Sequence, residues 1–246
     1  MTDSLNTLSS LRLSILRRRF LGTPLSPNSK VMRLYKVLVP QVLTAFQQAM
    51  LIGLMLGDVS LKFNKSLTGA SIQFEWGDKH QEYAFYVWHI LYPFCIELPR
   101  RQVRVNANGN TVVTWCYQTI THPVFLFLHT LFIVNGLKHI IPSLLMEAIN
   151  PVSLAFWFMD DGGQQDYRGY GLQFHTQGFT VDEVQSLCDI LTIKFGLDCW
   201  VKFNKQKPII AVSGNSYSTF FGLVCPYIHE SMRYKFPTGS RSVWPY

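Results

Sequence analysis

The sequence contains two related stretches, Leu51-Ile-Gly-Leu-Met-Leu-Gly-Asp58-Val and, one half-chain later, Leu154-Ala-Phe-Trp-Phe-Met-Asp-Asp161-Gly. Each is an apolar, helix-forming run that is closed by an acidic residue. The C-terminal end of a helix already carries partial negative charge, so a carboxylate is disfavoured there. Because the same unfavourable placement occurs twice, we expect a bound cation to be the missing partner of Asp58 and Asp161.

Small residues in the first stretch favour close packing of the two helices. Gly53 and Gly57 are four residues apart and therefore share one helix face. If the helices pack side by side, the carboxylates of Asp58 and Asp161 come close together and repel each other. A divalent cation relieves that repulsion, and carboxylates, backbone carbonyls and water are the ligands that Mg²⁺ prefers. Alone, each acid is an ordinary helix cap or surface acid; as an aligned pair, they predict a metal site.

The composition is that of a globular protein with an anionic partner. The chain has 246 residues and a formal charge of +7 on few charged residues, which points to a polyanionic partner such as nucleic acid. Charge alone leaves the alternative of a merely basic protein open. The longest apolar stretch, 124–134, is too short for a membrane span, which needs about 20 residues. The five cysteines form no CxxC pair, so a zinc site is not expected. They are typical of a protein in a reducing compartment.

Residues 1–40 are predicted to form a basic N-terminal arm and linker. The segment 12–20 is rich in arginine and amphipathic, which is typical of an organellar transit peptide and equally of a basic arm. No apolar stretch of secretory length is present near the start, so secretion is not expected. We therefore predict a mitochondrial or chloroplast location.

The remaining sequence reads as two halves, 41–145 and 146–246, that repeat one order of elements. In the first half we predict a helix at 41–57, two strands in 61–76 around a turn at 64–69, a helix at 78–91, a hairpin of 102–106 and 111–117 with a primed turn at Asn108-Gly109, and a helix at 122–134 that Gly136 terminates. In the second half we predict a helix from Pro151, a strand at 170–176, a capping box at Thr180 and Glu183 before a helix to 195, a hairpin of 199–204 and 208–212, and a helix at 217–228.

Three pairs of positions align the halves at an almost constant offset: Asp58 with Asp161, Gln73-Phe74 with Gln173-Phe174, and Lys138 with Lys235. The pattern predicts a duplicated αββαββα unit. Two equivalent sites in one chain suit a ligand with two-fold pseudo-symmetry, and duplex DNA is such a ligand.

The hairpin strands are predicted to form the DNA-reading surface. Alternation places polar side chains on one face of each strand, and Arg, Lys, Asn and Gln pair with base edges in the major groove. The residues are Gln102, Arg104 and Asn106 in the first hairpin, and Lys202 and Asn204 in the second. Lys205 and Lys207 in the turn are expected to hold phosphates. The alternative is an ordinary half-exposed sheet; the lack of carboxylates on these faces favours DNA.

The motifs resemble those of the LAGLIDADG homing endonucleases, and in particular the single-chain, intron-encoded members of the mitochondrial omega type. Shared-looking stretches are Gln73-Phe-Glu-Trp76, Leu131-Phe-Ile-Val-Asn135, Ser153-Leu-Ala-Phe-Trp-Phe-Met-Asp-Asp-Gly-Gly163, Thr176-Gln-Gly-Phe-Thr180 and Tyr234-Lys-Phe-Pro237. Two positions depart from the motif: Val59 and Phe156 stand where the family has glycine.

The resemblance implies an α+β fold, in which one chain forms a pseudo-two-fold dimer of αββαββα units. Two antiparallel, saddle-shaped sheets would lie over the DNA, with the motif helices at the interface between the halves. The implied activity is a double-strand break with 3′ overhangs at a long asymmetric site, made when a metal-activated water attacks a phosphodiester in each strand. We expect a monomer that uses Mg²⁺, with Mn²⁺ as a substitute and Ca²⁺ supporting binding without efficient cleavage.

The resemblance also assigns residues. Asp58 and Asp161 fall on the metal-binding acids, and Gly57 and Asp160 on the positions whose backbone carbonyls face the metal. Lys138 and Lys235 match the basic residue of each active site, with His139 as the alternative to Lys138 if the alignment shifts by one residue. Gln73 and Gln177 match polar positions near the chemistry, where a structural hydrogen bond is the alternative role.

Two other functions are possible on the same fold. One is an intron-splicing maturase that binds intron RNA, and the other is a DNA-binding protein that does not cut. Retention of both acids favours the nuclease, although it leaves a dual role open.

Overall fold

A computed structural model describes residues 26, 29–166, 169–238 and 244. The described residues form two compact units. The first unit contains the residues up to Thr44 together with Ser60–Leu126, and the second contains Ala45–Val59 together with the chain from Phe127 onward. The predicted transit-like segment 12–20 lies outside the described residues, and the division into halves at 145 stays a prediction. No described helix combines the length and the apolar character that crossing a bilayer requires.

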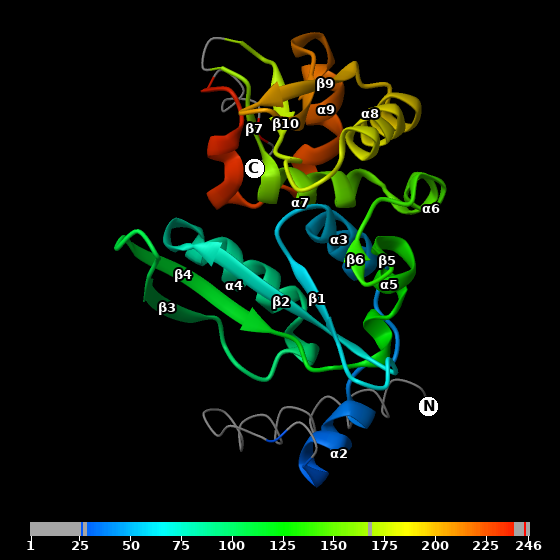
Figure 1. The fold of residues 1–246 in the computed structure, drawn as a ribbon, viewed down its shortest axis with the longest axis vertical. Helices are drawn as coiled ribbons and strands as arrows, with labels where there is room; N and C mark the ends of the chain where they lie inside the picture. Colours follow the sequence, from blue (N-terminus) through cyan, green and yellow to red (C-terminus); the bar gives the residue numbers. More distant parts are fainter. Residues whose placement is uncertain (1–25, 27–28, 167–168, 239–243, 245–246) are drawn as a thin grey trace. The chain divides into compact units, whose positions relative to one another are not determined.

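The first unit is built around a four-stranded antiparallel sheet with the order β1-β2-β4-β3 (Figure 1). Its elements are α2 (Lys30–Leu38), β1 (Ser60–Phe63), β2 (Ala70–Gly77), α4 (Gln81–Ile90), β3 (Arg100–Val105) and β4 (Thr111–Gln118), with short 3₁₀ turns at Asp78–His80, Tyr92–Phe94 and Pro123–Phe125. The Asn64 side chain closes the predicted turn before β2, because its Oδ1 accepts hydrogen bonds from the N–H groups of Thr68 and Gly69.

Aromatic side chains fill the core between this sheet and α4. Phe74 stacks on Tyr117 across the β2–β4 pair with ring centroids 4.6 Å apart, and Trp76 meets Tyr83 of α4 edge-on at 5.3 Å. Strand β3 lies at the sheet edge and is exposed along its whole length. The unit therefore has one aromatic, buried face and one open, polar face.

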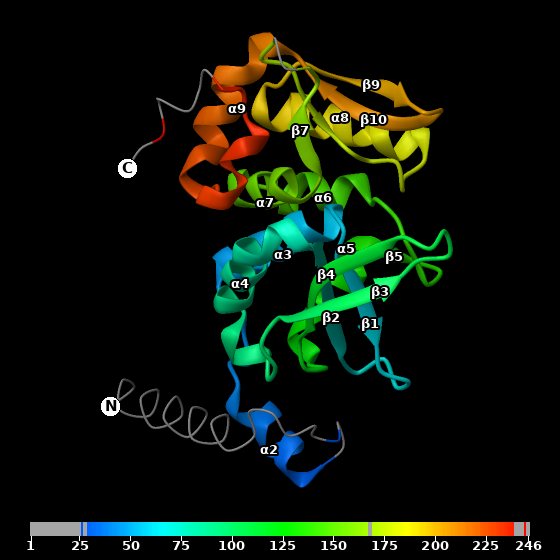
Figure 2. The ribbon, with the colours of Figure 1, turned by 90° about the vertical axis from the view of Figure 1, so that its left-hand side faces the viewer.

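The second unit repeats the same sheet topology. Its elements are α3 (Ala45–Leu56), α5 (Phe127–Phe132), β5 (Ile133–Val134), β6 (Leu137–Lys138), α6 (Pro142–Ala148), α7 (Pro151–Asp161), β7 (Gly162–Gln164), β8 (Leu172–Phe174), α8 (Val181–Phe195), β9 (Cys199–Asn204), β10 (Lys207–Val212) and α9 (Tyr217–Val224), followed by 3₁₀ turns at Cys225–Tyr227 and Glu230–Lys235. The sheet order β7-β8-β10-β9 matches β1-β2-β4-β3 position by position, which confirms the predicted duplication. Figure 2 shows α8 lying along this sheet.

The two motif helices, α3 and α7, pack directly on each other within the second unit (Figures 1 and 2). A Cβ atom on Gly53 would lie 2.1 Å from the carbonyl oxygen of Ser153, and one on Gly57 would lie 2.7 Å from Asp160 Cβ. Any larger side chain at these positions would force the helices apart. Phe156, at a motif position where glycine was expected, points instead at Phe46 and packs edge-on with a centroid distance of 5.9 Å.

The structure corrects several predicted elements. The helix predicted at 122–134 is shorter, because Asn135 and Gly136 both have positive φ and turn the chain into the β5–β6 hairpin. The turn at 108–109 is not a primed turn, since only Gly109 has positive φ there. Helices α2 and α6 and strand β7 were not predicted. The predicted capping box of Thr180 and Glu183 is present at the start of α8. A second capping box, at the start of α7, was not predicted.

Candidate active site

The two acidic residues lie at the C-terminal ends of the packed helices α3 and α7. Asp161 is the last residue of α7, and Asp58 follows α3 by two residues. Both line one pocket of about 530 Å³ in the second unit. The other lining residues are Leu56, Gly57, Lys138, His175, Gln177, Gly178 and Phe179. The structure thus brings together residues that lie one half-chain apart in the sequence.

Negative charge accumulates in this pocket. Burial raises the pKa of Asp161 to about 8, and the nearby carboxylates of Asp58 and Asp160 add to the shift while Lys235 and Lys138 oppose it. The Asp58 side chain is exposed, so the two acids occupy different environments. An oxygen-rich site in which carboxylates disfavour one another's ionisation favours a cation, which relieves the repulsion between them.

Two lysines approach the acids in equivalent ways. Lys138 Nζ donates a hydrogen bond to the carbonyl oxygen of Gly57 at 2.8 Å, and Lys235 Nζ donates one to the carbonyl oxygen of Asp160 at 2.6 Å. Each lysine therefore contacts the residue that directly precedes an acidic residue of its own motif. Burial lowers the pKa of Lys138, and the negative charges of Asp161, Asp58 and Asp160 oppose that shift.

His139, the alternative to Lys138, points elsewhere: its Nδ1 lies 3.0 Å from Glu183 Oε1. The geometry therefore favours the alignment that pairs Lys138 with Lys235. The side chain of Asp160 has a structural contact, because its Oδ2 accepts a hydrogen bond from the Asp58 N–H at 3.4 Å.

The pocket lining includes His175 and Phe179, to which the sequence analysis assigned no role. His175 N–H donates to the Asp161 carbonyl at 2.9 Å, and its Nδ1 lies 3.3 Å from Gln177 Nε2. Burial, followed by the charge of Lys235, lowers the pKa of His175 and keeps the imidazole neutral near pH 7. The position of His175 at the C-terminal end of the strand predicted at 170–176 was the available signal.

The predicted polar positions have different outcomes. Gln177 lines the pocket, as the resemblance implies. Gln73 belongs to the first unit, where its Nε2 lies 3.4 Å from Gln118 Oε1 across the β2–β4 pair. A structural hydrogen bond, the alternative considered for Gln73, is therefore present.

The second sheet carries its predicted cationic residues on one face. Phe174, Ile210 and Val201 are aligned across the sheet, and the Phe174 ring packs against Trp157 of α7 at 4.3 Å. Lys202 and Asn204 alternate with these core positions and so face away from α7. A small pocket at the hairpin end is lined by Gln177, Asn204, Lys205 and Lys207. Lys202, Lys205 and Lys207 form no ion pair among the residues that the structure describes.

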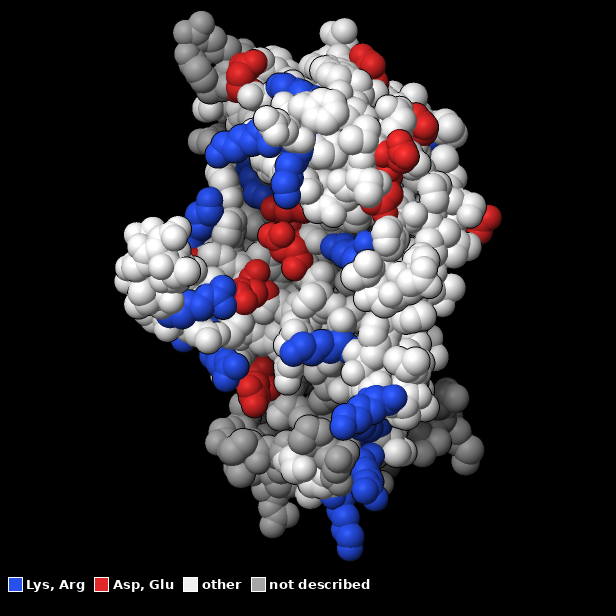
Figure 3. All heavy atoms as spheres, viewed as in Figure 1, with Lys and Arg blue, Asp and Glu red and all other residues white. Residues whose placement is uncertain are grey.

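The first sheet differs in charge from what the sequence predicted. Arg104 Nη2 pairs with Glu75 Oε1 at 2.5 Å, and Arg101 pairs with Asp78 at 2.9 Å. The expectation that the face of Arg104 lacks carboxylates is therefore wrong, because β2 contributes Glu75 to it. Arg101 and its partner Asp78 lie toward the other face of the sheet. Figure 3 shows acidic side chains interspersed among the basic ones on the face viewed there. Asn106 also has a local role, because its Oδ1 accepts hydrogen bonds from the N–H groups of Asn108 and Asn110.

The donor set of the acid pocket fits a hard divalent cation. No cluster of three or more His, Cys, Asp or Glu side chains suited to a metal occurs in the described part of the chain. A metal here would therefore rely on the carboxylates of Asp58 and Asp161, the carbonyl oxygens of Gly57 and Asp160, and oxygens of water or substrate. Mg²⁺ commonly takes one or two carboxylates together with waters and phosphate oxygens.

A protein-family model matches most of the chain. The model of the LAGLIDADG DNA endonuclease family matches residues 48–220. The chain belongs to this family. The matched range begins within α3 and ends within α9, so it contains most of α3, all of α7 and both four-stranded sheets.

Individual relatives extend the match to most of the chain. The chain is 42% identical over 215 residues to "Probable intron-encoded endonuclease 1" of Wickerhamomyces canadensis, which covers 86% of this chain and 92% of the relative. It is 29% identical over 195 residues to "Cytochrome b mRNA maturase bI2" of Debaryomyces hansenii, a match that covers 76% of this chain and 71% of the relative. The solved structure of the homing endonuclease I-WcaI bound to its DNA recognition sequence matches with a TM-score of 0.82 and 41% identity, over 89% of this chain and 96% of that one.

Proposed function

We propose that this LAGLIDADG protein is a site-specific homing endonuclease that cuts both strands of a long, asymmetric DNA site and leaves 3′ overhangs. The observation that carries the proposal is the pocket at the ends of α3 and α7, which Asp58, Asp161 and Lys138 line. Lys235 approaches the second motif as Lys138 approaches the first, through a hydrogen bond to the carbonyl oxygen of the residue before the acid. Duplication of the acid and of the lysine supports two cleavage events, one for each strand.

In this proposal, Asp58, Asp161 and the carbonyl oxygens of Gly57 and Asp160 hold divalent cations, Mg²⁺ or Mn²⁺. Such a cation, when bound, neutralises the carboxylates and stabilises negative charge on phosphate oxygens. Asp161 must be ionised to act as a ligand, so its raised pKa means that a proton leaves its carboxyl group when the cation binds. A carbonyl oxygen has two lone pairs, so Gly57 and Asp160 retain an acceptor site beside the lysine contact.

Lys138 and Lys235 each supply positive charge beside one scissile phosphate. An ammonium group in that position stabilises the charge that develops on the phosphate oxygens or orients the attacking water. Gln177 and the neutral His175 line the same pocket and offer hydrogen bonds to water. The nucleophile is water in each strand, and the 3′-oxygen is the leaving group.

The two sheets are proposed to bind the DNA. Lys202 and Asn204 of the second sheet, and Gln102 and Arg104 of the first, would contact bases, while Lys205 and Lys207 would contact phosphates. The DNA-bound I-WcaI structure, at 41% identity, supports this use of the fold. We further propose that the protein acts as a monomer in an organelle, because the two-motif chain already contains both sites and its relatives include an intron-encoded endonuclease.

Substitution of the acids tests the proposal. Asp58→Asn and Asp161→Asn should each abolish double-strand cleavage of a plasmid that carries the intronless host-gene junction, while binding of that site is retained. Asp189→Asn, which changes an exposed acid on α8, is the matched control and should cut normally. Near-normal double-strand cleavage by either active-site variant would refute the paired-acid mechanism.

Metal exchange tests the cation. Cleavage should require Mg²⁺ or Mn²⁺ and disappear in EDTA, whereas Ca²⁺ should support specific binding with little cutting. Binding is measured by gel shift and cleavage by the conversion of supercoiled to linear plasmid. Full cleavage in EDTA would remove the cation from the mechanism.

A maturase role is the second candidate, favoured by the similarity to the Debaryomyces hansenii maturase. A maturase would bind its intron RNA and accelerate splicing in vitro, and this activity would survive Asp161→Asn. DNA cleavage without any effect on splicing would exclude the second role.

A further inference from the structure

Lys138 is carried by a small hairpin that needs an anchor. Strands β5 and β6 have two residues each, and the hairpin turns at Asn135-Gly136. An isolated two-stranded hairpin is marginally stable at best in water. A lysine whose ammonium group must meet Gly57 O at 2.8 Å therefore depends on contacts that hold the main chain next to it.

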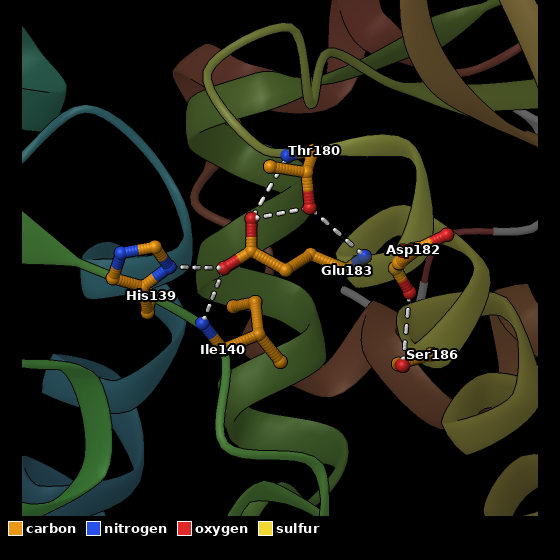
Figure 4. Close-up of polar contacts among 6 residues, drawn as sticks. All are labelled: His139, Ile140, Thr180, Asp182, Glu183 and Ser186. Atoms are coloured by element: carbon orange, nitrogen blue, oxygen red, sulfur yellow. Dashed lines mark hydrogen bonds and ion pairs between the residues drawn. The ribbon is translucent and has the colours of Figure 1, made fainter. Parts of the chain in front are cut away.

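Glu183 makes those contacts (Figure 4). Its Oε1 accepts hydrogen bonds from the Ile140 N–H at 2.9 Å and from His139 Nδ1 at 3.0 Å, so it holds the two residues that directly follow Lys138. Its other oxygen, Oε2, accepts from the Thr180 N–H at 2.8 Å and from Thr180 Oγ1 at 2.9 Å. A capping box uses only the Thr180 contacts. One carboxylate thus caps α8 and also fixes the β6 strand.

The same segment also contacts the ammonium group. Phe179, which directly precedes the cap residue Thr180, lies under Lys138 Nζ at 5.5 Å from its ring centroid. The segment 179–183 thus holds Lys138 on two sides: Glu183 bonds the two residues that follow it, and Phe179 packs against its ammonium group. Burial acts to raise the pKa of Glu183, but the hydrogen bonds from Thr180, Ile140 and His139 hold it below its usual value and keep the carboxylate ionised.

Lys235 is anchored by a different kind of contact. The next residue, Phe236, is fully buried and packs against Phe158 of α7 at 4.7 Å and against Trp244 at 5.2 Å. Aromatic packing therefore holds the chain next to the second lysine, whereas the carboxylate of Glu183 holds the chain next to the first. A change at Glu183 should disturb one of the two lysines and leave the other in place.

We propose that Glu183 is a positioning residue for Lys138, and that it controls the rate at which one of the two DNA strands is cut. Glu183 does not line the pocket, so it acts through the main-chain N–H of Ile140 and the side chain of His139. The proposal rests on the catalytic role assigned to Lys138 above.

Two complementary variants separate positioning from helix capping. Glu183→Gln keeps an oxygen for the Thr180 cap, as glutamine does in capping boxes, but turns an NH₂ group toward the Ile140 N–H. Thr180→Ala does the reverse: it removes the cap hydroxyl and leaves Oε1 of Glu183 on His139 and Ile140. Both are compared with Lys138→Met and Lys235→Met. Each strand of a bound target duplex carries its own fluorophore, and single-turnover cleavage is started with Mg²⁺.

Glu183→Gln should slow the strand that Lys138→Met slows by roughly 10- to 100-fold, which is the range for a small misplacement of a catalytic group. The other strand should stay within about two-fold, and nicked DNA should accumulate. In the double variant Glu183→Gln with Lys138→Met, the slowed strand should be cut no more slowly than in Lys138→Met alone, because the two changes affect one contact. Thr180→Ala should cut both strands at the wild-type ratio.

The outcomes separate the inference from the proposed function. If Lys138→Met shows no strand preference, the catalytic role of Lys138 fails, whatever Glu183 does. If Lys138→Met is strand-selective but Glu183→Gln slows both strands equally, or neither, the positioning role is overturned and the proposed function stands. A strand-selective defect in Thr180→Ala equal to that of Glu183→Gln would also overturn it, since helix capping would then explain both.

Discussion

The two halves of the chain share one sheet topology but hold their charges differently. On the first sheet, Arg104 and Arg101 are paired with Glu75 and Asp78. On the second, Lys202, Lys205 and Lys207 form no ion pair among the described residues. A surface arginine that already has a carboxylate partner must exchange it before it can contact a base, whereas an unpaired lysine can meet a phosphate directly. We therefore expect the second sheet to contribute more to DNA affinity than the first.

The largest effect should come from the lysines, where the halves are most alike. Lys138→Met and Lys235→Met should each slow cutting of a different strand by about 10²- to 10³-fold, the loss expected when a charge-stabilising donor is removed. Affinity should hardly change, since each is one phosphate contact among many. Strand-specific single-turnover rates on bound DNA measure this. Equal slowing of both strands in both variants would make them phosphate anchors instead, and a strand-selective defect in His139→Ala alone would shift the first-half alignment by one residue.

Substitutions on the two sheets should have different effects on the salt dependence of DNA binding. Lys205→Ala or Lys207→Ala should weaken binding to all sequences and reduce the slope of log affinity against log salt by roughly 0.9 for each lost phosphate contact. Arg104→Ala should leave that slope nearly unchanged and relax preference at one or two base pairs, each worth about 1–3 kcal/mol. Titrations of target and mismatched duplexes at several salt concentrations provide both numbers. If Arg104→Ala reduced the salt slope, and the lysine variants changed base preference instead, the expected difference between the two sheets would be wrong.

The acids should differ in how they affect stability without metal. The pKa of Asp161 is raised in the folded state, so folding takes up a proton and stability falls as pH rises from about 4 toward about 8. In EDTA at pH 8, Asp161→Asn should therefore have a higher Tm than wild type, by roughly 2–4 °C for each ~1 kcal/mol of destabilisation that the substitution removes. At pH 4 the variant and the wild type should have the same Tm. Asp58 is exposed, so Asp58→Asn should change Tm less. Thermal melts at the two pH values are the measurement, and a lower Tm for Asp161→Asn at pH 8 would contradict the assignment.

The smallest effect concerns the hairpin turns. The β9–β10 turn places Lys205 and Gln206 at φ of 49° and 65°, whereas the β3–β4 turn has glycine at its positive-φ position, Gly109. Non-glycine residues are strained in that region. The double variant Lys205→Asn with Gln206→Gly should raise the free energy of unfolding by about 1 kcal/mol while weakening DNA binding. Urea titrations measure the gain, and Gly109→Ala is the control that should lose stability.

The sequence predicted most elements because their signals are local. The Asn150 and Thr180 caps, the hairpin at 199–212 and the acidic ends of both motifs each depend on a few neighbouring residues. The Asn-Gly signal shows where this fails. A primed turn was predicted at 108–109, but three loop residues allow a type I turn followed by a left-handed glycine there. Two successive positive-φ residues, as in a primed turn, occur instead at 205–206 and at 135–136, and at the latter a preceding apolar run indicated a helix.

The candidate site was predictable where the two halves could be aligned, and not elsewhere. Asp58, Asp161, Lys138 and Lys235 repeat at matching positions, so two weak signals reinforce each other. His175 and Glu183 have no such repeat, and their neighbours in space are distant in sequence. The Glu75–Arg104 pair was missed for the same reason, since only the register of β2, β4 and β3 brings these residues to one face.

The path of the chain through the second unit also has a consequence for folding. Helix α3 is buried from Ala49 to Leu56, and its packing partner α7 begins only at Pro151. Between them the chain makes the whole sheet of the first unit. During synthesis α3 therefore leaves the ribosome long before α7 exists, with its apolar face uncovered. Contacts of such large sequence separation slow folding, so the catalytic pocket should be the last part of the protein to form and the step most dependent on chaperones.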